Sequence, residues 1–323
     1  MKKSFVFLLV LAMAASILVG CQSNSQEYPT KPIKLIIPTK PGGDIDQNGR
    51  LLSASIEKYL GQPMVAVNQD GGGGNVAIKE LLDAKEDGYQ FIYFNTSWIT
   101  GIVADKYKYD VNDLEPVVSV SVNDTLIFAV PFDSEIKDAK DLAKRIKEEP
   151  ETVKYAATIG APSQFHALAI EKANGGKFKK IDVGSGADKT VALVSGSIDV
   201  LSTTIGLMKD YISTDKVRAI GSICAERSQF AEDIPTFNEQ GIDLGPGFAP
   251  IYTIYCKVGT PQNIKDKVIE AVKKAMEDPE IVEKFKNSLF TPKVMYGQEL
   301  VDYLDGIYTY LNSMKEEILN DKF

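Results

Sequence analysis

The chain has 323 residues, of which 44% are hydrophobic and 25% are charged, a composition that suits a folded protein large enough for two domains. Its formal net charge is −8, so nucleic acid is excluded as a partner, although local backbone dipoles still permit a small anionic ligand. His166 is the single histidine and there is no CxxC pair, so we expect neither a metal site nor a cofactor.

The first twenty residues predict a secretory signal peptide. Lys2 and Lys3 give a positive start, residues 5–19 are nearly all apolar, and Gly20 precedes Cys21. A small residue before a cysteine resembles the lipobox of bacterial lipoproteins, in which the thiol is acylated. An ordinary signal peptide with an incidental cysteine is the alternative. Residues 21–27 are polar and suit the tether of a lipid-anchored, extracytoplasmic protein.

The first folded stretch predicts a strand, a turn and a helix. Residues 33–37 form a short apolar run that ends before the turn at Gly42-Gly43. Asp44 and Gln47 have the spacing of a capping box, so a helix is expected to begin there. Such a turn leaves backbone N–H groups free at the positive end of a helix, which suits an anion. The alternative is that these residues only make the turn and cap the helix.

The same order of features continues along the chain. Residues 64–68 predict a second strand, and four glycines at 71–74 suggest unusual torsions or a close backbone approach, with a flexible surface loop as the alternative. A third strand at 89–95 ends in a polar segment that contains Ser97. Strands that alternate with helices predict an α/β layer with a mostly parallel sheet, whose ligands lie at the carboxyl ends of the strands.

A long β-rich run at residues 117–131 predicts the passage from a first lobe to a second. A strand at 154–158 then leads into the turn Ala161-Pro162-Ser163 and another helix, as in the opening stretch. The loop at 184–188 follows one further strand. Cys224 and Cys256 each lie in apolar, strand-like runs, so we expect two buried free thiols.

The last third of the chain predicts helices. One begins at Thr260-Pro261 and carries an apolar stripe through Ile264, Val268, Val272 and Met276. Another begins at Pro279, and the last is expected to run without a break over residues 298–320.

Enzyme signatures are weak in this sequence. Neither a GxGxxG segment, a phosphate-binding loop nor a GxSxG nucleophile elbow is present. Ser163 and His166 are three positions apart near one face of a helix, which makes a serine–histidine hydrolase conceivable. A structural histidine within a helix is the simpler interpretation.

Many short segments in the right order resemble the extracytoplasmic solute receptors of tripartite tricarboxylate transporters, over essentially the whole mature chain. In the first half these segments are Tyr28-Pro29 with Lys31-Pro32-Ile33, Pro41-Gly42-Gly43 with Asp46 and Arg50, Leu60-Gly61-Gln62-Pro63, Asn68 with the glycine loop through Asn75, and Asp87-Gly88-Tyr89. In the second half they are Gly160 with Ser163 and His166, Gly196 with Ile198-Asp199, Arg227 with Ile234-Pro235-Thr236, and Gly259-Thr260-Pro261.

The resemblance implies a two-lobed α/β fold of the periplasmic-binding-protein, Venus-flytrap type (type II-like), in which each lobe has a mixed, mostly parallel sheet flanked by helices. Lobe 1 would comprise residues 28–126 and 248–323, and lobe 2 residues 127–247, so the chain would cross between the lobes twice. The protein would be a monomeric binding protein rather than an enzyme, with the integral membrane subunits of a transporter as partners.

The resemblance also implies a ligand site between the lobes. A carboxylate would be held largely by backbone amides, and Asp46 would hold waters that bridge to the ligand. The expected ligand-binding residues are Thr39, Gly42, Gly43, Asp44, Asp46, Gly73, Ser97, Ala161, Pro162, Ser163, His166, Gly184, Ser185, Gly186, Asp188 and Thr203.

Three departures from the family pattern bear on the ligand. Thr39 stands where a bulkier apolar residue is common, Gln69-Asp70 replaces Arg-Pro, and Asp188-Lys189 adds two charges beside the second-lobe loop. Asp44 and Asp188 would suit an ammonium group, so an amino-acid-like ligand is expected beside dicarboxylates and tricarboxylates. A lipid-anchored hydrolase and the ligand-sensing component of a signalling system remain the alternatives from other classes.

Overall fold

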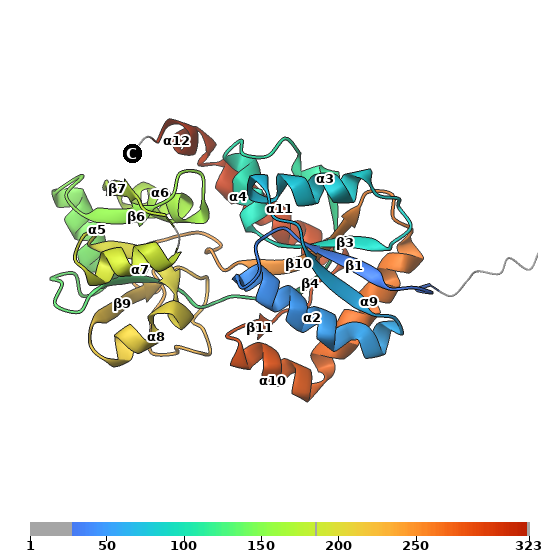
Figure 1. The fold of residues 1–323 in the computed structure, drawn as a ribbon. Helices are drawn as coiled ribbons and strands as arrows, with labels where there is room; N and C mark the ends of the chain where they lie inside the picture. Colours follow the sequence, from blue (N-terminus) through green and yellow to red (C-terminus); the bar gives the residue numbers. More distant parts are fainter. Residues whose placement is uncertain (1–27, 185, 322–323) are drawn as a thin grey trace, which may run out of the picture.

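The computed structural model describes residues 28–184 and 186–321, which form two α/β lobes built on separate sheets (Figure 1). The predicted signal peptide, the tether and Cys21 lie outside these residues. In the first sheet the strand order is β11-β4-β10-β3-β1-β2, and its strands are β1 (Ile33–Ile37), β2 (Met64–Asn68), β3 (Gln90–Asn95), β4 (Leu114–Val122), β10 (Ile251–Lys257) and β11 (Thr291–Pro292). In the second the order is β7-β6-β8-β5-β9, formed by β5 (Leu126–Pro131), β6 (Lys154–Ala157), β7 (Lys179–Asp182), β8 (Val200–Thr204) and β9 (Val217–Ser222).

Both sheets are mixed and most strands of each run in one direction, as predicted; β10 and β11 run against the others in the first sheet, and β5 does so in the second. In the first sheet β1 is parallel to β2 and β3, whereas β10 is antiparallel to β3 and β4, and β11 is antiparallel to β4. In the second, β6 is parallel to β7 and β8, and β5 is antiparallel to β8 and β9. The antiparallel pairs arise because β4 and β5 carry the chain out to the second lobe and β9 and β10 carry it back.

Helices cover the faces of both sheets. Around the first sheet are α2 (Asp44–Leu60), α3 (Asn75–Asp83), α4 (Ser97–Val103), α9 (Gln262–Glu277), α10 (Pro279–Asn287) and α11 (Gly297–Asn312), with two short 3-10 turns, η1 (Gly72–Gly74) and η2 (Val111–Asp113). Around the second are α5 (Ala139–Glu148), α6 (Pro162–Asn174), α7 (Gly186–Val194) and α8 (Ile205–Ser213). No helix in the described ranges is both long and apolar enough to cross a membrane.

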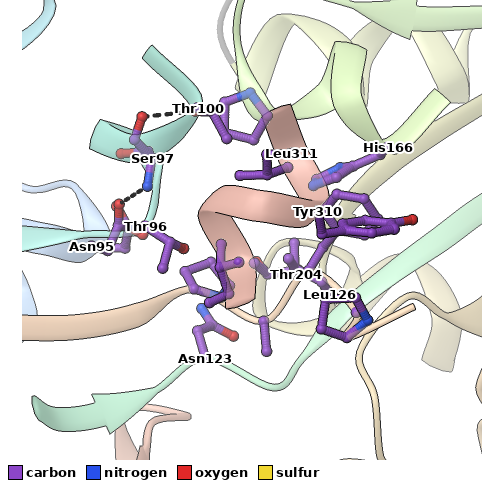
Figure 2. Close-up of a pocket in the computed structure, with 18 of the residues that line it drawn as sticks. Asn95, Thr96, Ser97, Thr100, Asn123, Leu126, His166, Thr204, Tyr310 and Leu311 are labelled. Atoms are coloured by element: carbon purple, nitrogen blue, oxygen red, sulfur yellow. Dashed lines mark hydrogen bonds between the residues drawn. The ribbon is translucent and has the colours of Figure 1, made fainter. Parts of the chain in front are cut away.

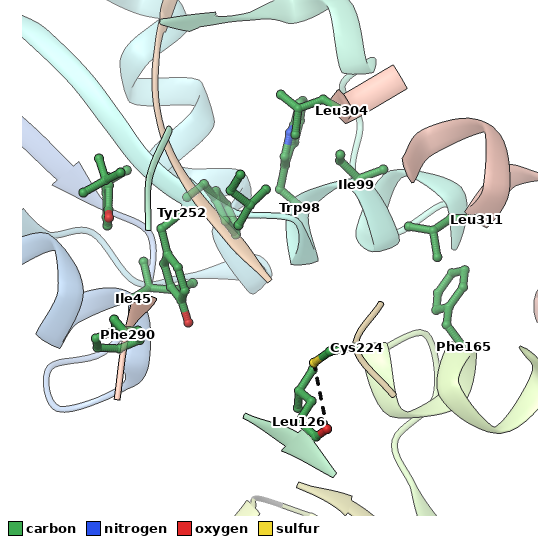
Figure 3. Packing of buried hydrophobic residues seen from close by; sticks show 14 of the residues in the cluster. Ile45, Trp98, Ile99, Leu126, Phe165, Cys224, Tyr252, Phe290, Leu304 and Leu311 are labelled. Atoms are coloured by element: carbon green, nitrogen blue, oxygen red, sulfur yellow. Dashed lines mark hydrogen bonds between the residues drawn. The ribbon is translucent and has the colours of Figure 1, made fainter. Parts of the chain in front are cut away.

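The apolar periodicities of the sequence account for the core. The stripe predicted on α9 is buried at Ile264, Val268 and Val272, and α9 packs beside α2. Near the lobe junction, Tyr252 of β10 stacks edge-to-face on Phe290 with ring centroids 5.3 Å apart (Figure 3). Aromatic pairs of this geometry stabilise a core beyond the area they bury.

The predicted C-terminal helix is interrupted. It breaks after α11, and a separate α12 (Lys315–Asn320) turns away and packs against α6 of the second lobe (Figure 1). Lys172 Nζ donates to the carbonyl oxygen of Ser313 at the break, at 3.0 Å. Just beyond α12, Asp321 Oδ1 lies 2.8 Å from Lys180 Nζ in β7. The chain therefore reaches the second lobe again at its end, so α12 does not belong to lobe 1 alone, as residues 248–323 were expected to.

Both remaining cysteines are buried free thiols, as the sequence predicted. Cys256 lies in β10, and Cys224 follows β9, where its Sγ lies 3.9 Å from the carbonyl oxygen of Leu126 (Figure 3). Burial raises the pKa of each thiol to about 11, so both are protonated and unreactive at neutral pH.

Candidate functional site

A cavity of about 300 Å³ lies where the two lobes meet (Figure 2). The first lobe contributes Asp44 and Ile45 of α2, the β3–α4 segment Asn95-Thr96-Ser97, and Thr100. Pro162, His166 and Thr204 come from the second lobe, and Ile307, Tyr310 and Leu311 from α11. Both connections between the lobes also line it, through Asn123 and Leu126 on one side and residues 246–250 on the other. A small molecule in this cavity would touch both lobes and both connections.

Aromatic rings from three distant segments form one wall of the cavity. The His166 ring meets Phe248 edge-on with centroids 4.8 Å apart, and Phe248 meets Tyr310 in the same way at 5.9 Å. His166 and Tyr310 are labelled in Figure 2. Phe248 and Tyr310 were not predicted as site residues, because the periodicity of α11 and the apolar return segment predict core packing. Their common position becomes evident only once the chain has crossed back between the lobes.

Four of the predicted site residues line this cavity, namely Asp44, Ser97, Pro162 and His166. Ser97 begins α4, and its carbonyl oxygen accepts from Thr100 Oγ1 at 2.7 Å, while its backbone N–H donates to Asn95 Oδ1 at 3.0 Å (Figure 2). The neighbouring Asn95 and Asn123 also face the cavity but were not predicted. Asn95 and Asn123 are both polar residues at strand ends, and this feature of the sequence could have identified them.

Asp44 does not cap α2, contrary to the prediction. The N-cap is Gly43, which has no side chain to form a cap bond, and the predicted partner Gln47 donates to the carbonyl oxygen of Gly42. The exposed Asp44 carboxylate instead accepts through Oδ2 from Tyr252 Oη at 2.5 Å. Since it lines the cavity, its other oxygen is placed to accept from a ligand donor.

Asp46 stabilises the turn between β1 and α2 through its hydrogen bonds. Its buried carboxylate accepts from Gly42 N at 2.9 Å, from Arg50 Nε at 2.9 Å and from Asn68 Nδ2 at 2.8 Å. Burial alone would raise the pKa of Asp46, but these donors outweigh it and hold the pKa below its ordinary value. Three of the roughly four acceptor positions of this carboxylate are thus used within the protein, and its expected water-holding role stays a prediction.

Fewer backbone amides are free than the sequence predicted. Gly42 N–H is bonded to Asp46, Ala161 N–H donates to the carbonyl oxygen of Thr158 at 3.0 Å, and Pro162 has no N–H. Among the described residues, no acceptor bonds the amides of Gly43 or Asp44 at the start of α2, or that of Ser163 at the start of α6. The second lobe therefore brings one free amide, not three, to the expected carboxylate position.

Ser163 is held by two donors from its own lobe. Its buried Oγ accepts from Thr158 N at 3.1 Å and from Lys189 Nζ at 3.1 Å. His166 is not among its partners, so the serine–histidine pair of the hydrolase alternative does not form. That alternative loses the geometry on which it depends.

A chain of hydrogen bonds fixes the tautomer of His166. Tyr155 Oη donates to the carbonyl oxygen of Ser163 at 2.9 Å, so Ser202 Oγ donates to Tyr155 Oη at 2.7 Å. With its proton used, Ser202 Oγ must accept from His166 Nδ1, 2.9 Å away. Burial, helped by the nearby charge of Lys189, lowers the pKa of His166 to about 3. The ring is therefore neutral at pH 7, with Nε2 an acceptor.

The remaining predicted residues lie elsewhere. Thr203 is buried in β8, and its neighbour Thr204 lines the cavity instead, because successive strand residues point to opposite faces. All four glycines of the 71–74 loop have positive φ, which confirms the predicted torsions, but the carbonyl oxygen of Gly73 accepts from Tyr107 Oη at 2.6 Å and does not line the cavity. Thr39 Oγ1 is buried without a partner among the described residues.

The second-lobe loop lies beside the cavity rather than in its wall. Gly184 and Gly186 are exposed, and a Cβ at Gly184 would lie 2.8 Å from Asp188 Oδ2. Ser185 is outside the described residues. Within the described ranges, no group of three or more His, Cys, Asp or Glu side chains is placed to hold a metal ion.

Two lobes that enclose a cavity at their junction define the class of two-lobed solute-binding proteins, and comparison with solved structures agrees. A TctC solute-binding protein from Polaromonas superposes with a TM-score of 0.78 at 21% identity, covering 90% of this chain and 99% of that one. MatC from Rhodopseudomonas palustris, with bound malate, gives a TM-score of 0.69 at 21% identity, covering 91% and 100%.

The family follows from the sequence comparison. The profile described as tripartite tricarboxylate transporter family receptor matches residues 49–313. A protein from Pseudomonas sp. strain P51, named UPF0065 protein in the tcbD-tcbE intergenic region, is 26% identical over 292 residues, covering 86% of this chain and 84% of the relative. The chain belongs to the tripartite tricarboxylate transporter receptor family, as the resemblance of its motifs implied.

Proposed function

We propose that this chain captures a small carboxylate between its two lobes by domain closure and delivers it to the membrane subunits of a tripartite tricarboxylate-type transporter. The observation that carries this proposal is the cavity of about 300 Å³ with walls from both lobes and both connections. Ligand pockets typically measure about 300–1,000 Å³, so this one suits a molecule with few carbon atoms. Malate, bound by the R. palustris neighbour, is of that size and kind.

Closure follows from the position of the site. A ligand that contacts residues 28–126 and 248–312 on one side and 127–247 on the other favours the closed arrangement and shifts the population toward it. A thermal-shift panel of dicarboxylates, tricarboxylates and amino acids tests binding. A ligand at about a hundred times its dissociation constant should add about 2.7 kcal/mol of stability, which raises the melting temperature by a few degrees. If no carboxylate shifts the melt, or X-ray scattering shows no compaction with one that does, the proposal fails.

The ligand class is a dicarboxylate, a tricarboxylate or an amino-acid-like carboxylate. Asp44 supports the last of these, since its carboxylate lines the cavity with one oxygen bonded to Tyr252. His166 Nε2 adds a second acceptor at the wall, because the ring proton is on Nδ1, which donates to Ser202 Oγ. Two acceptors in one cavity favour a ligand that carries an ammonium or hydroxyl group as well as its carboxylate.

We further propose an extracytoplasmic location. Residues 1–20 would be removed as a signal peptide, and lipidated Cys21 would hold the monomeric protein at the cell membrane through the 21–27 tether. Membrane fractionation of a Cys21→Ser variant tests the anchor, because loss of the lipid should release or mislocalise the protein. Unchanged membrane association would exclude it. Light scattering of the soluble form measures its molar mass and so tests whether the protein is a monomer.

The protein is proposed to bind without catalysing a reaction. The support is that Ser163 lacks the bond to His166 that would activate it, while His166 is neutral and weakly basic. Model esters should therefore not be turned over. Hydrolysis that is lost in Ser163→Ala would overturn this.

A further inference from the structure

We propose that Lys189, together with Ser163 Oγ, is the charged receptor for a ligand carboxylate and determines which ligands the proposed binding site accepts. This inference rests on the proposed function and deepens it. The two side chains come from the first turn of α7 and the first turn of α6, so they meet where two helices of the second lobe begin. Lys189 and Ser163 are not among the described residues that line the cavity, but Ser163 adjoins it, because it directly follows Pro162 and lies three residues before His166, which both line it.

Lys189 is a buried cation without a counter-ion. It is 9% exposed, and among the described residues no carboxylate forms a salt bridge with it. Lys180, the other buried lysine of this lobe, is 8% exposed and lies 2.9 Å from Glu171 Oε1 and 2.8 Å from Asp321 Oδ1. A buried charge is costly unless it is paired. Lys189 is therefore the lysine whose charge a bound anion would neutralise.

The hydrogen bonds of Ser163 leave its own proton free to donate. Its Oγ accepts from Thr158 N and from Lys189 Nζ, which occupies both lone pairs and leaves the O–H to donate. No acceptor among the described residues takes that proton, although Ser163 is only 8% exposed. Lys189 retains two N–H groups that have no acceptor in the described part of the chain, and the Ser163 backbone N–H is free as well.

These donors replace the backbone amides that are missing from the site. Ala161 N–H is already bonded and Pro162 has none, so Ser163 supplies the single free amide at the start of α6. A carboxylate placed there would receive charge-assisted bonds from Lys189, which are roughly twice as strong as neutral ones. His166 cannot contribute, because its Nδ1 proton is bonded to Ser202 and its Nε2 has no proton to donate.

Three other titratable groups surround Lys189. They are His166 of α6, whose pKa is lowered to about 3, Asp182 at the end of β7, and Asp188, the preceding residue in α7. Burial lowers the pKa of Lys189, and the charge of Asp182 opposes this only in part. Lys189 therefore loses its charge at a lower pH than an exposed lysine does.

Calorimetry with succinate, malate, citrate and aspartate tests the proposal. In Lys189→Met, affinity for the carboxylates that bind the wild type should fall at least about tenfold, since a hydrogen bond to a charged group contributes about 1.5–3 kcal/mol. The unliganded variant should melt at or above the wild-type temperature, because an unpaired buried charge has been removed. Lys209→Met, which alters an exposed lysine in α8 of the same lobe, is the matched control and should bind as the wild type does.

The wild-type protein provides a second measurement that does not depend on the variant folding. Bound carboxylate stabilises charged Lys189, so affinity should be full below the pKa of the free lysine and fall as pH rises through it. Titrations in buffers of different ionisation enthalpy should show proton uptake on binding in that range, and Lys189→Met should show none.

The outcomes separate the two proposals. If the wild type binds no carboxylate, the proposed function itself fails. If it binds, but Lys189→Met has the same affinity and pH profile, the receptor role of Lys189 is overturned while the function stands. Ester hydrolysis that is lost in Lys189→Met would also overturn it, since Lys189 would then act as a base for Ser163.

Discussion

Lys106 Nζ donates a hydrogen bond to the carbonyl oxygen of Ile159, and this bond joins the two lobes. Lys106 follows α4 in the first lobe, whereas Ile159 lies in the loop before α6 in the second. The next residue, Gly160, has φ of +64°, and a side chain there would lie within 2.2 Å of the Lys106 Cε atom. The positive φ favours glycine at position 160, the missing side chain leaves room for Lys106, and the bond joins the lobes beside the cavity.

Lys106→Met should loosen the closed arrangement. The variant loses the bond to Ile159, so the unliganded protein should show a larger radius of gyration by X-ray scattering. Carboxylate affinity should fall by less than tenfold, in proportion to the smaller closed fraction. Lys108→Met is the matched control, because Lys108 is exposed and its side chain makes no bond within the described residues. An unchanged radius of gyration in both variants would show that the bond from Lys106 to Ile159 does not hold the lobes closed.

Asp46→Asn should destabilise the first lobe. Gly42 N–H, Arg50 and Asn68 all donate to this carboxylate, and the amide of asparagine would turn a donor toward one of them. We expect a loss of about 1–3 kcal/mol in the free energy of unfolding, measured by urea denaturation. Asp83→Asn in the exposed Lys79–Asp83 pair is the control and should change it by less than about 1 kcal/mol. Equal effects of the two substitutions would contradict the role assigned to Asp46.

The same carboxylate predicts a pH dependence. The folded-state pKa of Asp46 lies below its ordinary value, so its contribution to stability is full above the unfolded pKa of about 3.9. That contribution is lost as pH falls through the lower folded pKa. The stability difference between the wild type and Asp46→Asn should therefore be constant near pH 7 and shrink below about pH 4. A stability difference between the two proteins that grows as pH falls would contradict this prediction.

Much of the fold was predictable, because apolar periodicity and turn residues act locally. The first strand occupies residues 33–37 as predicted, and the α9 stripe is buried. Long-range geometry was less accessible. The antiparallel pairing of β4 with β10 depends on where the chain crosses between lobes, and α12 turns back because Asp321 meets Lys180, far away in the sequence.

The sequence was enough to predict which loops form the site, but not which of their atoms are free to bind a ligand. Glycines and strand ends marked the β1–α2 and β6–α6 turns, and both turns reach the cavity through Asp44, Pro162 and His166. Which amides stay free depends on side-chain bonds such as that of Asp46 to Gly42, which spacing does not reveal. Lys189 beside Asp188 suggests an exposed pair of charges, and its burial against Ser163 follows only from the meeting of α6 and α7.

Asp44→Asn should distinguish amino-acid ligands from plain dicarboxylates. Asparagine can still accept from Tyr252 Oη, so the local bond is kept while the negative charge at the cavity wall is lost. Affinity for aspartate and glutamate should fall about tenfold, because an ammonium group loses its charged acceptor, as expected for a charge-assisted bond of about 1.5–3 kcal/mol. Succinate affinity should stay the same or rise, since the repulsion of its carboxylates is reduced. If calorimetry gives the same change in affinity for both ligand types, Asp44 does not bind the ammonium group.

The two buried thiols should report closure of the lobes. Cys256 lies in β10 within the first sheet, whereas Cys224 follows β9 in the second lobe, beside Leu126 (Figure 3) and in contact with Gly247 of the return connection. Both thiols have a pKa raised to about 11, so alkylation of the native protein should be slow and should require local opening.

Opening of the connections exposes Cys224 before Cys256, so Cys224 should react faster in the unliganded protein. A bound carboxylate that closes the lobes should slow Cys224 several-fold more than Cys256. Peptide mass spectrometry after timed alkylation measures both rates in one sample, and Cys21→Ser removes the thiol that lies outside the described residues. The variants Cys224→Ser and Cys256→Ser verify each assignment. Equal protection of both thiols by ligand would mean that binding stabilises the molecule as a whole without a distinct closure at the connections.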